Sequence, residues 1–138
     1  MAHKVTYSNP EGAAPAQGRY SHVGTTSGGK LHFLAGQLAV APDGSVAGRH
    51  DFEAQFLQVF QNLGDVLRGL GCGFNDIVRF TTYVVHSQDL EHFHRLRAEH
   101  FPKWFEGTDY PPNTLLTIDR LVKEDFLFEV EAIVQARD

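Results

Sequence analysis

The sequence predicts an α+β fold in which a small mixed β-sheet carries two helices on one face. Two segments repeat apolar residues at the three-to-four spacing of an amphipathic helix, whereas the other apolar residues lie in short β-branched and aromatic runs. These segments follow the order β-β-β-α-β-α-β-β, and two helices can cover only one face of the sheet. The 138 residues are expected to form one domain, residues 1–138.

Four elements are expected in the first half of the chain. They are strands over residues 19–26 and 30–40, a short strand around Val46, and a helix from Asp51 to Leu70. Residues 27–29, Ser-Gly-Gly, predict a hairpin turn between the first two strands because glycine adopts a positive φ without strain. Gly71 follows the helix directly and is suited to end it.

Four more elements are expected in the second half. They are a strand over residues 77–85, a helix from Ser87 to about Phe101, and strands over residues 114–121 and 126–134. Ser87 is suited to be the N-cap of this helix, and Pro102 is expected to end it.

The final strand indicates that the chain associates with copies of itself. Five of its residues face the expected helices, namely Phe126, Phe128, Val130, Ala132 and Val134. The opposite face carries Leu127, Glu129, Glu131 and Ile133. Because two helices leave this face without a cover, other copies are expected to cover it and to place the glutamates near subunit clefts. The alternative is a solvated face with scattered Leu and Ile.

The composition excludes several classes of protein. Twelve Lys and Arg against seventeen Asp and Glu give a net charge of −5, which argues against binding nucleic acid. No run reaches the roughly 18 apolar residues of a membrane span and no signal segment is present, so a cytoplasmic protein without a membrane partner is expected. Cys72 is the single cysteine, which excludes an intrachain disulfide. His92, His94 and His100 lack the four-residue spacing of a helical zinc site, so no metal is expected.

A pair of carboxylates is the first candidate for chemistry. Glu129 and Glu131 share one face of the final strand, about 6.5 Å apart. Two carboxylates at this spacing push each other's pKa values apart, as an acid/base pair requires. The favoured alternative from the residues alone is that one or both form salt bridges with Arg79 or Arg120 on neighbouring strands.

Arg97 is the second candidate, because it lies within the apolar stripe of the second helix. A guanidinium among apolar side chains stays charged and is expected to pair with an anion, either a glutamate or a ligand carboxylate. The alternative places Arg97 at the edge of the stripe with its head in water. A third candidate is the segment over residues 18–22, whose Tyr20 and His22 suit a pocket wall and equally suit an ordinary surface strand.

Five short motifs appear in order along the chain. They are Ala35–Gln37, Phe60–Leu63, Asp76–Val84, Tyr110–Leu115 and Glu129–Ile133. Together they resemble the Rid (reactive intermediate deaminase) family, also called the YjgF family, and the likeness extends from about residue 18 to residue 134. The resemblance implies a chorismate-mutase-like fold and a homotrimer with small-molecule ligand clefts between subunits. It also implies hydrolysis of reactive enamines and imines, such as 2-aminoacrylate, to a keto acid and ammonia without a metal or organic cofactor.

The resemblance assigns roles to individual residues. Glu129 matches the glutamate proposed to handle the hydrolytic water, Tyr20 the tyrosine of the pocket loop, and Gly36 a glycine whose backbone lines the pocket. Asn113 stands where the family has the arginine that clamps the substrate carboxylate, so the chain is similar to a divergent member. Imino-acid binding is then expected to weaken by roughly one or two powers of ten. Arg97 stands where the family has asparagine, which suggests that Arg97 restores a cation to the cleft from the other side.

Two functions follow as predictions. The first is a trimeric enzyme that hydrolyses a small reactive enamine or imine, in which Glu129 positions and deprotonates water. Asn113 and the backbone near Gly36 orient the substrate in this hypothesis, while Tyr20 and His22 shape the pocket. The second is a non-catalytic trimer that binds a small metabolite in the same clefts. A ribonuclease role, also attached to the family by name, is disfavoured by the net charge.

Overall fold

The structure is a computed structural model that describes residues 5–137. Its elements are β1 (Val5–Ser8), β2 (Val23–Thr26), β3 (Leu31–Gln37), α1 (Phe52–Gly69), a 3-10 turn (Phe74–Asp76), β4 (Ile77–Val84), α2 (Asp89–Trp104), β5 (Asn113–Thr117) and β6 (Phe128–Gln135). The predicted α+β class and the predicted order of strands and helices are confirmed. Neither helix within the described residues combines the length and apolar character needed to cross a bilayer.

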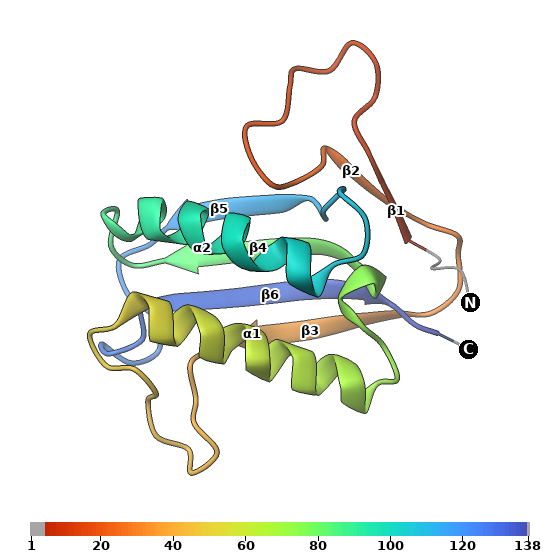
Figure 1. The fold of residues 1–138 in the computed structure, drawn as a ribbon. Helices are drawn as coiled ribbons and strands as arrows, with labels where there is room; N and C mark the ends of the chain where they lie inside the picture. Colours follow the sequence, from red (N-terminus) through yellow and green to blue (C-terminus); the bar gives the residue numbers. More distant parts are fainter. Residues whose placement is uncertain (1–4, 138) are drawn as a thin grey trace.

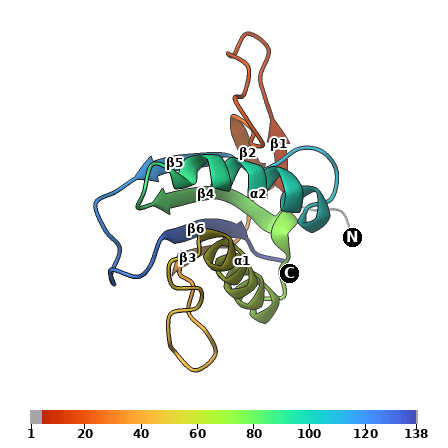
Figure 2. The ribbon, with the colours of Figure 1, turned by 60° about the vertical axis from the view of Figure 1, so that its left-hand side comes forward.

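The main sheet has the strand order β3-β6-β4-β5. The β4–β5 pair is parallel and the other two pairs are antiparallel, so the sheet is mixed as predicted. Figures 1 and 2 show both helices on the same face of this sheet. The core lies between these layers, where Phe128 of β6 stacks on Phe56 of α1 with ring centroids 5.4 Å apart.

The second sheet is a two-stranded ribbon of β1 and β2, which corrects the predicted hairpin. Gly28 and Gly29 do adopt positive φ values of 97° and 94°. However, β2 pairs with β1 and β3 pairs with β6, so the two glycines turn the chain from one sheet into the other. Tyr7 anchors the ribbon because its hydroxyl donates to the carbonyl oxygen of Ile77 at 2.7 Å. The expected strand around Val46 is reduced to an isolated bridge.

The helices agree with the sequence in position and differ at their ends. Asp51 caps α1, and Gly71, with a φ of 72°, follows its end as predicted. The N-cap of α2 is Gln88 rather than Ser87, and it makes no side-chain capping bond. This helix also continues through Pro102 to Trp104, beyond the predicted end.

Strand β3 contains one extra residue relative to its partner β6. Leu34 lies opposite Ala132, and the next pair joins Gln37 to Val130. Three residues of β3 therefore span the same length as two residues of β6, which is the count of a β-bulge. The bulge falls at Ala35 and Gly36.

The loop between β5 and β6, residues 118–127, is fixed to the rest of the molecule near its end. The fully buried side chain of Gln55 donates to the carbonyl oxygen of Asp125 at 2.8 Å and accepts the N–H of Leu127 at 2.8 Å. Arg49 adds an ion pair to Asp125 at 3.1 Å. Helix α1 therefore sets the position of this loop.

Candidate functional site

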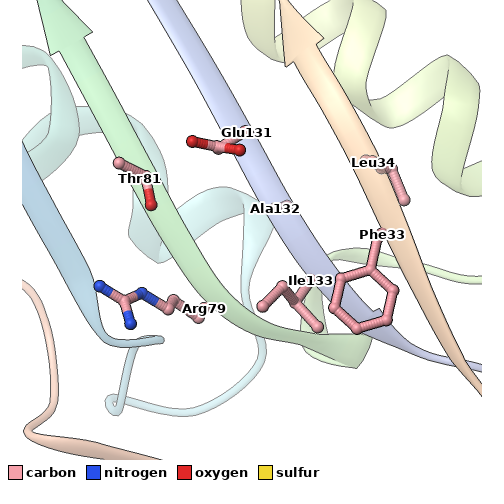
Figure 3. A pocket seen from close by; sticks show the side chains of 7 residues that line it. All are labelled: Phe33, Leu34, Arg79, Thr81, Glu131, Ala132 and Ile133. Carbon is pink, nitrogen blue, oxygen red and sulfur yellow. The ribbon is translucent and has the colours of Figure 1, made fainter.

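The open face of the sheet, opposite the helices, mixes apolar and polar side chains. Figure 3 shows this face, with Arg79 and Thr81 from β4, Glu131 and Ile133 from β6, and Phe33 from β3. These residues border a shallow cavity of about 250 Å³. The Phe33 ring is 74% exposed, which is unusual for so large an apolar side chain.

A second depression of about 380 Å³ lies on the same face, next to the β5–β6 loop. Its lining includes Gly36, Tyr83, Arg120, Val122, Glu129 and Glu131. We call it the Glu129 depression. It combines the predicted pair of carboxylates and a predicted pocket glycine with three side chains, Tyr83, Arg120 and Val122, that had no predicted role in binding.

Gly36 and Glu129 are in direct contact across the bulge in β3. A Cβ atom on residue 36 would lie 2.6 Å from the carboxyl carbon of Glu129 and 2.9 Å from its Cγ. Both distances are shorter than real side chains allow, so only glycine leaves room for this carboxylate. Before the structure, only the family resemblance placed Gly36 and Glu129 in the same pocket.

Two carboxylates and a tyrosine form the polar part of the depression. The Tyr83 hydroxyl donates a hydrogen bond to Glu131, and this bond raises the tyrosine pKa. Burial, assisted by the negative charge of Glu131, raises the pKa of Glu129 above its usual value. Glu129 therefore holds a proton more readily than an ordinary glutamate.

The expected salt bridges to these carboxylates are not formed among residues 5–137. Arg79 donates instead to the hydroxyl of Thr114 at 2.9 Å. Arg120 pairs with Glu124 of its own loop at 2.9 Å. The favoured alternative of the sequence analysis is therefore wrong for the single chain, and both carboxylates stay available to a ligand or a partner.

Arg97 lies on the other side of the sheet, under the loop that joins β1 to β2. It is 3% exposed, and its guanidinium lies 4.9 Å from the centre of the Phe93 ring. The loop covers it so closely that a Cβ on Gly18 would lie 2.8 Å from Nη2 of Arg97. The alternative prediction, in which the guanidinium of Arg97 lies in water, is therefore wrong.

The guanidinium of Arg97 has no carboxylate partner within the described part of the chain. Its Nη2 approaches only Nδ1 of His94, at 3.4 Å, and its Nε has no hydrogen-bond partner. Burial lowers the pKa of Arg97 to about 10. A buried cation without an anion costs free energy unless something outside this chain compensates it.

Tyr20 and His22 belong to the loop between β1 and β2, which projects from the sheet (Figure 2). The Tyr20 hydroxyl accepts the N–H of Gln17 at 3.1 Å, and its ring packs edge-on against His22. The His22 ring is exposed and contacts the carbonyl oxygen of Ala14. Both side chains shape this loop, and Tyr20 is near Arg97.

Asn113 begins β5 at the edge of the sheet. It lies in register with Phe80, so its side chain is on the helix side, and it accepts a 2.7 Å hydrogen bond from the hydroxyl of Thr82. The predicted site residues therefore form two groups. Gly36 and Glu129 are on the open face, whereas Asn113, Tyr20 and Arg97 are on the helix side.

Tyr83 and Arg120 had no predicted role in binding. Tyr83 pairs in register with Glu129, and the alternation along β4 puts it on the face of the sheet that Phe80 does not share. Arg120 was expected inside a strand, but β5 ends at Thr117. No local pattern could place the side chain of Arg120, because the loop is positioned by the distant Gln55.

Comparison with known proteins decides the family. Residues 11–136 match the family described as endoribonuclease L-PSP. The chain belongs to this family. A solved structure from Yersinia pestis, described as a protein of unknown function of the conserved Rid family, superimposes with a TM-score of 0.84. It shares 32% identity and covers 95% of this chain and 98% of that one, so the predicted resemblance to Rid proteins is confirmed.

Two sequence relatives extend this result. A RutC family protein from Pyrococcus horikoshii is 30% identical over 123 residues, which are 89% of this chain and 91% of that one. Reactive Intermediate Deaminase A, a chloroplastic protein of Arabidopsis thaliana, is 28% identical over 92 residues. That match spans 67% of this chain and 48% of the plant protein. A protein named as a deaminase is therefore among the distant relatives of this chain.

Proposed function

We propose that this Rid protein forms a homotrimer and hydrolyses a small enamine or imine metabolite in clefts between its subunits. The observation that carries the proposal is the environment of Glu129. Its carboxylate is half-buried, is paired with no cation of the described chain, and has a raised pKa in a depression of ligand size. A carboxylate whose pKa is shifted toward neutrality can take a proton from water and return it.

Assembly is supported by the distribution of the site residues over two sides of one chain. Glu129 and Gly36 of one copy can complete a site with Tyr20, Arg97 and Asn113 only if a neighbouring copy supplies the second group. Such a head-to-tail contact closes into a ring when the rotation permits. The exposed Phe33 ring favours coverage of the open face, and the uncompensated charge of Arg97 favours an anion from outside the chain.

The chemistry requires one group that moves protons. An enamine first takes a proton at carbon to become an iminium ion. Glu129 then accepts a proton from water while the water oxygen bonds to the iminium carbon, which gives a carbinolamine. The same carboxyl returns its proton to the nitrogen, and the C–N bond breaks as the carboxylate takes the proton of the hydroxyl group, so that ammonia leaves and a keto group forms. Asn113 and the backbone at Gly36 orient the substrate, Tyr20 and His22 shape the pocket, and Arg97 adds positive potential from the neighbouring copy.

The proposal is tested with imines generated in situ by an amino-acid oxidase or a lyase. Accelerated release of ammonia and keto acid from 2-iminobutyrate and 2-aminoacrylate is expected, with weak binding of both because Asn113 offers their carboxylates no charge. Glu129→Gln is expected to abolish the acceleration, and Glu99→Gln, an exposed change of the same kind on α2, to leave it unchanged. A thermal shift with metabolites but no turnover supports the non-catalytic binding trimer instead.

A further inference from the structure

Tyr83 of β4 connects the two carboxylates of the Glu129 depression. We propose that Tyr83 is a positioning residue: it holds the negative charge of Glu131 beside Glu129 and thereby makes Glu129 a stronger base toward the attacking water. The inference rests on the proposed function of Glu129. It goes further by assigning roles to two groups that act through Glu129 rather than on the substrate.

The side chain of Tyr83 crosses from one carboxylate position to the other. In the ladder between β4 and β6, Tyr83 is in register with Glu129, whereas Glu131 is in register with Thr81. The hydrogen bond from the Tyr83 hydroxyl to Glu131 is therefore diagonal, over a separation that an aromatic side chain can span. Since the side chain starts opposite Glu129 and ends on Glu131, it fixes the second carboxylate relative to the first.

Glu131 needs such a partner to stay near Glu129. Two ionised carboxylates on one face of a strand repel each other. The half-buried side chain of Glu131 could turn toward water and separate the charges, but its carboxylate accepts the Tyr83 hydroxyl. Within residues 5–137, Tyr83 is its one hydrogen-bond partner. The bond therefore retains a charge that repulsion would otherwise move away.

A tyrosine holds this charge without cancelling it. A lysine or arginine in the same place would form an ion pair with Glu131 and compensate its charge, whereas a hydroxyl is neutral. The hydrogen bond to Glu131 raises the pKa of Tyr83, so the hydroxyl keeps its proton at neutral pH. Arg79, on the same face of β4, donates to Thr114 of β5 at 2.9 Å and leaves Glu131 to the tyrosine (Figure 3).

The elements around the depression leave the charge of Glu131 effective. The β5–β6 loop contributes Arg120, whose guanidinium pairs with Glu124 of the same loop at 2.9 Å. Among the described residues, β3 contributes Gly36 to the lining and no charged side chain. The charge of Glu131 therefore acts on Glu129, in agreement with its part in the raised pKa of Glu129.

The test measures the proton affinity of Glu129 without requiring turnover. The side-chain carboxyl carbons of the full chain, labelled with carbon-13, are titrated by NMR, and Glu129→Gln assigns the signal. Tyr83→Phe removes the hydroxyl and keeps the ring. The titration midpoint of Glu129 is expected to fall by about half a pH unit in Tyr83→Phe and by about one pH unit in Glu131→Gln.

A double variant shows whether the hydroxyl acts through Glu131. If it does, Tyr83→Phe adds no further shift to a chain that already carries Glu131→Gln. Tyr7→Phe is the matched control, because it removes a hydroxyl that donates at 2.7 Å to the carbonyl oxygen of Ile77, and it is expected to leave the midpoint unchanged. A further shift in the double variant, or an equal shift in Tyr7→Phe, overturns the proposal. Thermal melting verifies that each variant folds.

The pH dependence of kcat/KM gives a second readout. In Tyr83→Phe its fall at acid pH is expected to move with the NMR midpoint, and the rate at neutral pH to drop about threefold as Glu129 becomes a weaker base. A midpoint that stays or rises in Tyr83→Phe overturns the role, because Glu131 then keeps its place without the hydroxyl or approaches Glu129 when released. A lowered midpoint in a chain that hydrolyses no imine supports the positioning of Glu131 by Tyr83, while the hydrolytic function fails.

Discussion

The carboxylate of Glu129 occupies the space in which residue 36 would carry a Cβ atom. The contact exists because the extra residue in β3 brings the backbone of Gly36 against β6. The position of the Glu129 carboxylate, the candidate catalytic group, therefore depends on residue 36 of the neighbouring strand having no side chain. The contact can be tested by adding a single methyl group.

Gly36→Ala is expected to lower keto-acid formation at least about tenfold, because the new methyl group displaces the carboxylate by a distance that matters for proton transfer. Melting temperature is expected to change little, since a flexible side chain can move aside. Gly69→Ala, at a position with no atom within 4 Å of an added Cβ, is the control. Full activity in Gly36→Ala would contradict the proposed role of Glu129.

The rate of hydrolysis is expected to fall at acid pH as Glu129 becomes protonated and can no longer accept a proton from water. Because Glu131 contributes to the raised pKa of Glu129, Glu131→Gln is expected to move this acid limb to lower pH. The measurement is the pH dependence of kcat/KM for both chains. If the rate falls at the same acid pH in the unmodified chain and in Glu131→Gln, a group other than Glu129 is responsible for the fall.

Stability should also depend on the protonation of Glu129. Since folding raises its pKa, the folded state prefers the protonated form, and this contribution is lost as pH rises through the folded-state pKa. Glu129→Gln, which stays neutral, is therefore expected to melt at a higher temperature than the unmodified chain at neutral pH. The difference should disappear below about pH 4, and Glu99→Gln should show no such trend.

Arg97→Ala is expected to lower both activity and affinity for 2-oxobutyrate several-fold, because the cleft loses positive potential. Arg95→Ala removes an exposed arginine from the same helix and should have no effect on either. Arg97→Lys should retain part of the affinity. Unchanged affinity in a correctly folded Arg97→Ala chain removes Arg97 from the site.

Phe33→Asp is expected to convert the proposed trimer into single protomers, because it places a charge on the open face next to Ile133. Sedimentation velocity measures the conversion, and activity should fall together with the trimer. Leu70→Asp, a change at another exposed apolar side chain, just beyond the end of α1, is the control. A single protomer at working concentration in the unmodified chain would remove the clefts altogether.

The elements that the sequence predicted best are those whose pattern is local. The periodicity over Asp51–Leu70 is sufficient because α1 packs one continuous stripe into the core. The continuation of α2 through Pro102 needed tertiary information. There, Trp104 packs against Phe60 of α1 with ring centroids 5.1 Å apart, which holds the last turn in place.

Pairing between strands was harder to predict than the strands themselves. The glycines at 28 and 29 are typical of a hairpin, yet β3 finds its partner a hundred residues further along the chain in β6. The candidate site shows the same limit. Glu129 could be indicated from its alternation and from the resemblance, whereas the position of Arg120 depends on two hydrogen bonds of Gln55.

The irregularity in β3 affects how relatives of this chain can diverge. Loss of one residue between Leu34 and Gln37 would remove the bulge and restore an even ladder with β6, in which Gln37 still pairs with Val130 and keeps its face. Such a chain would keep its hydrogen-bonded sheet while Gly36 moved off Glu129. Length variation at this single point can therefore produce descendants that fold normally and are chemically inert.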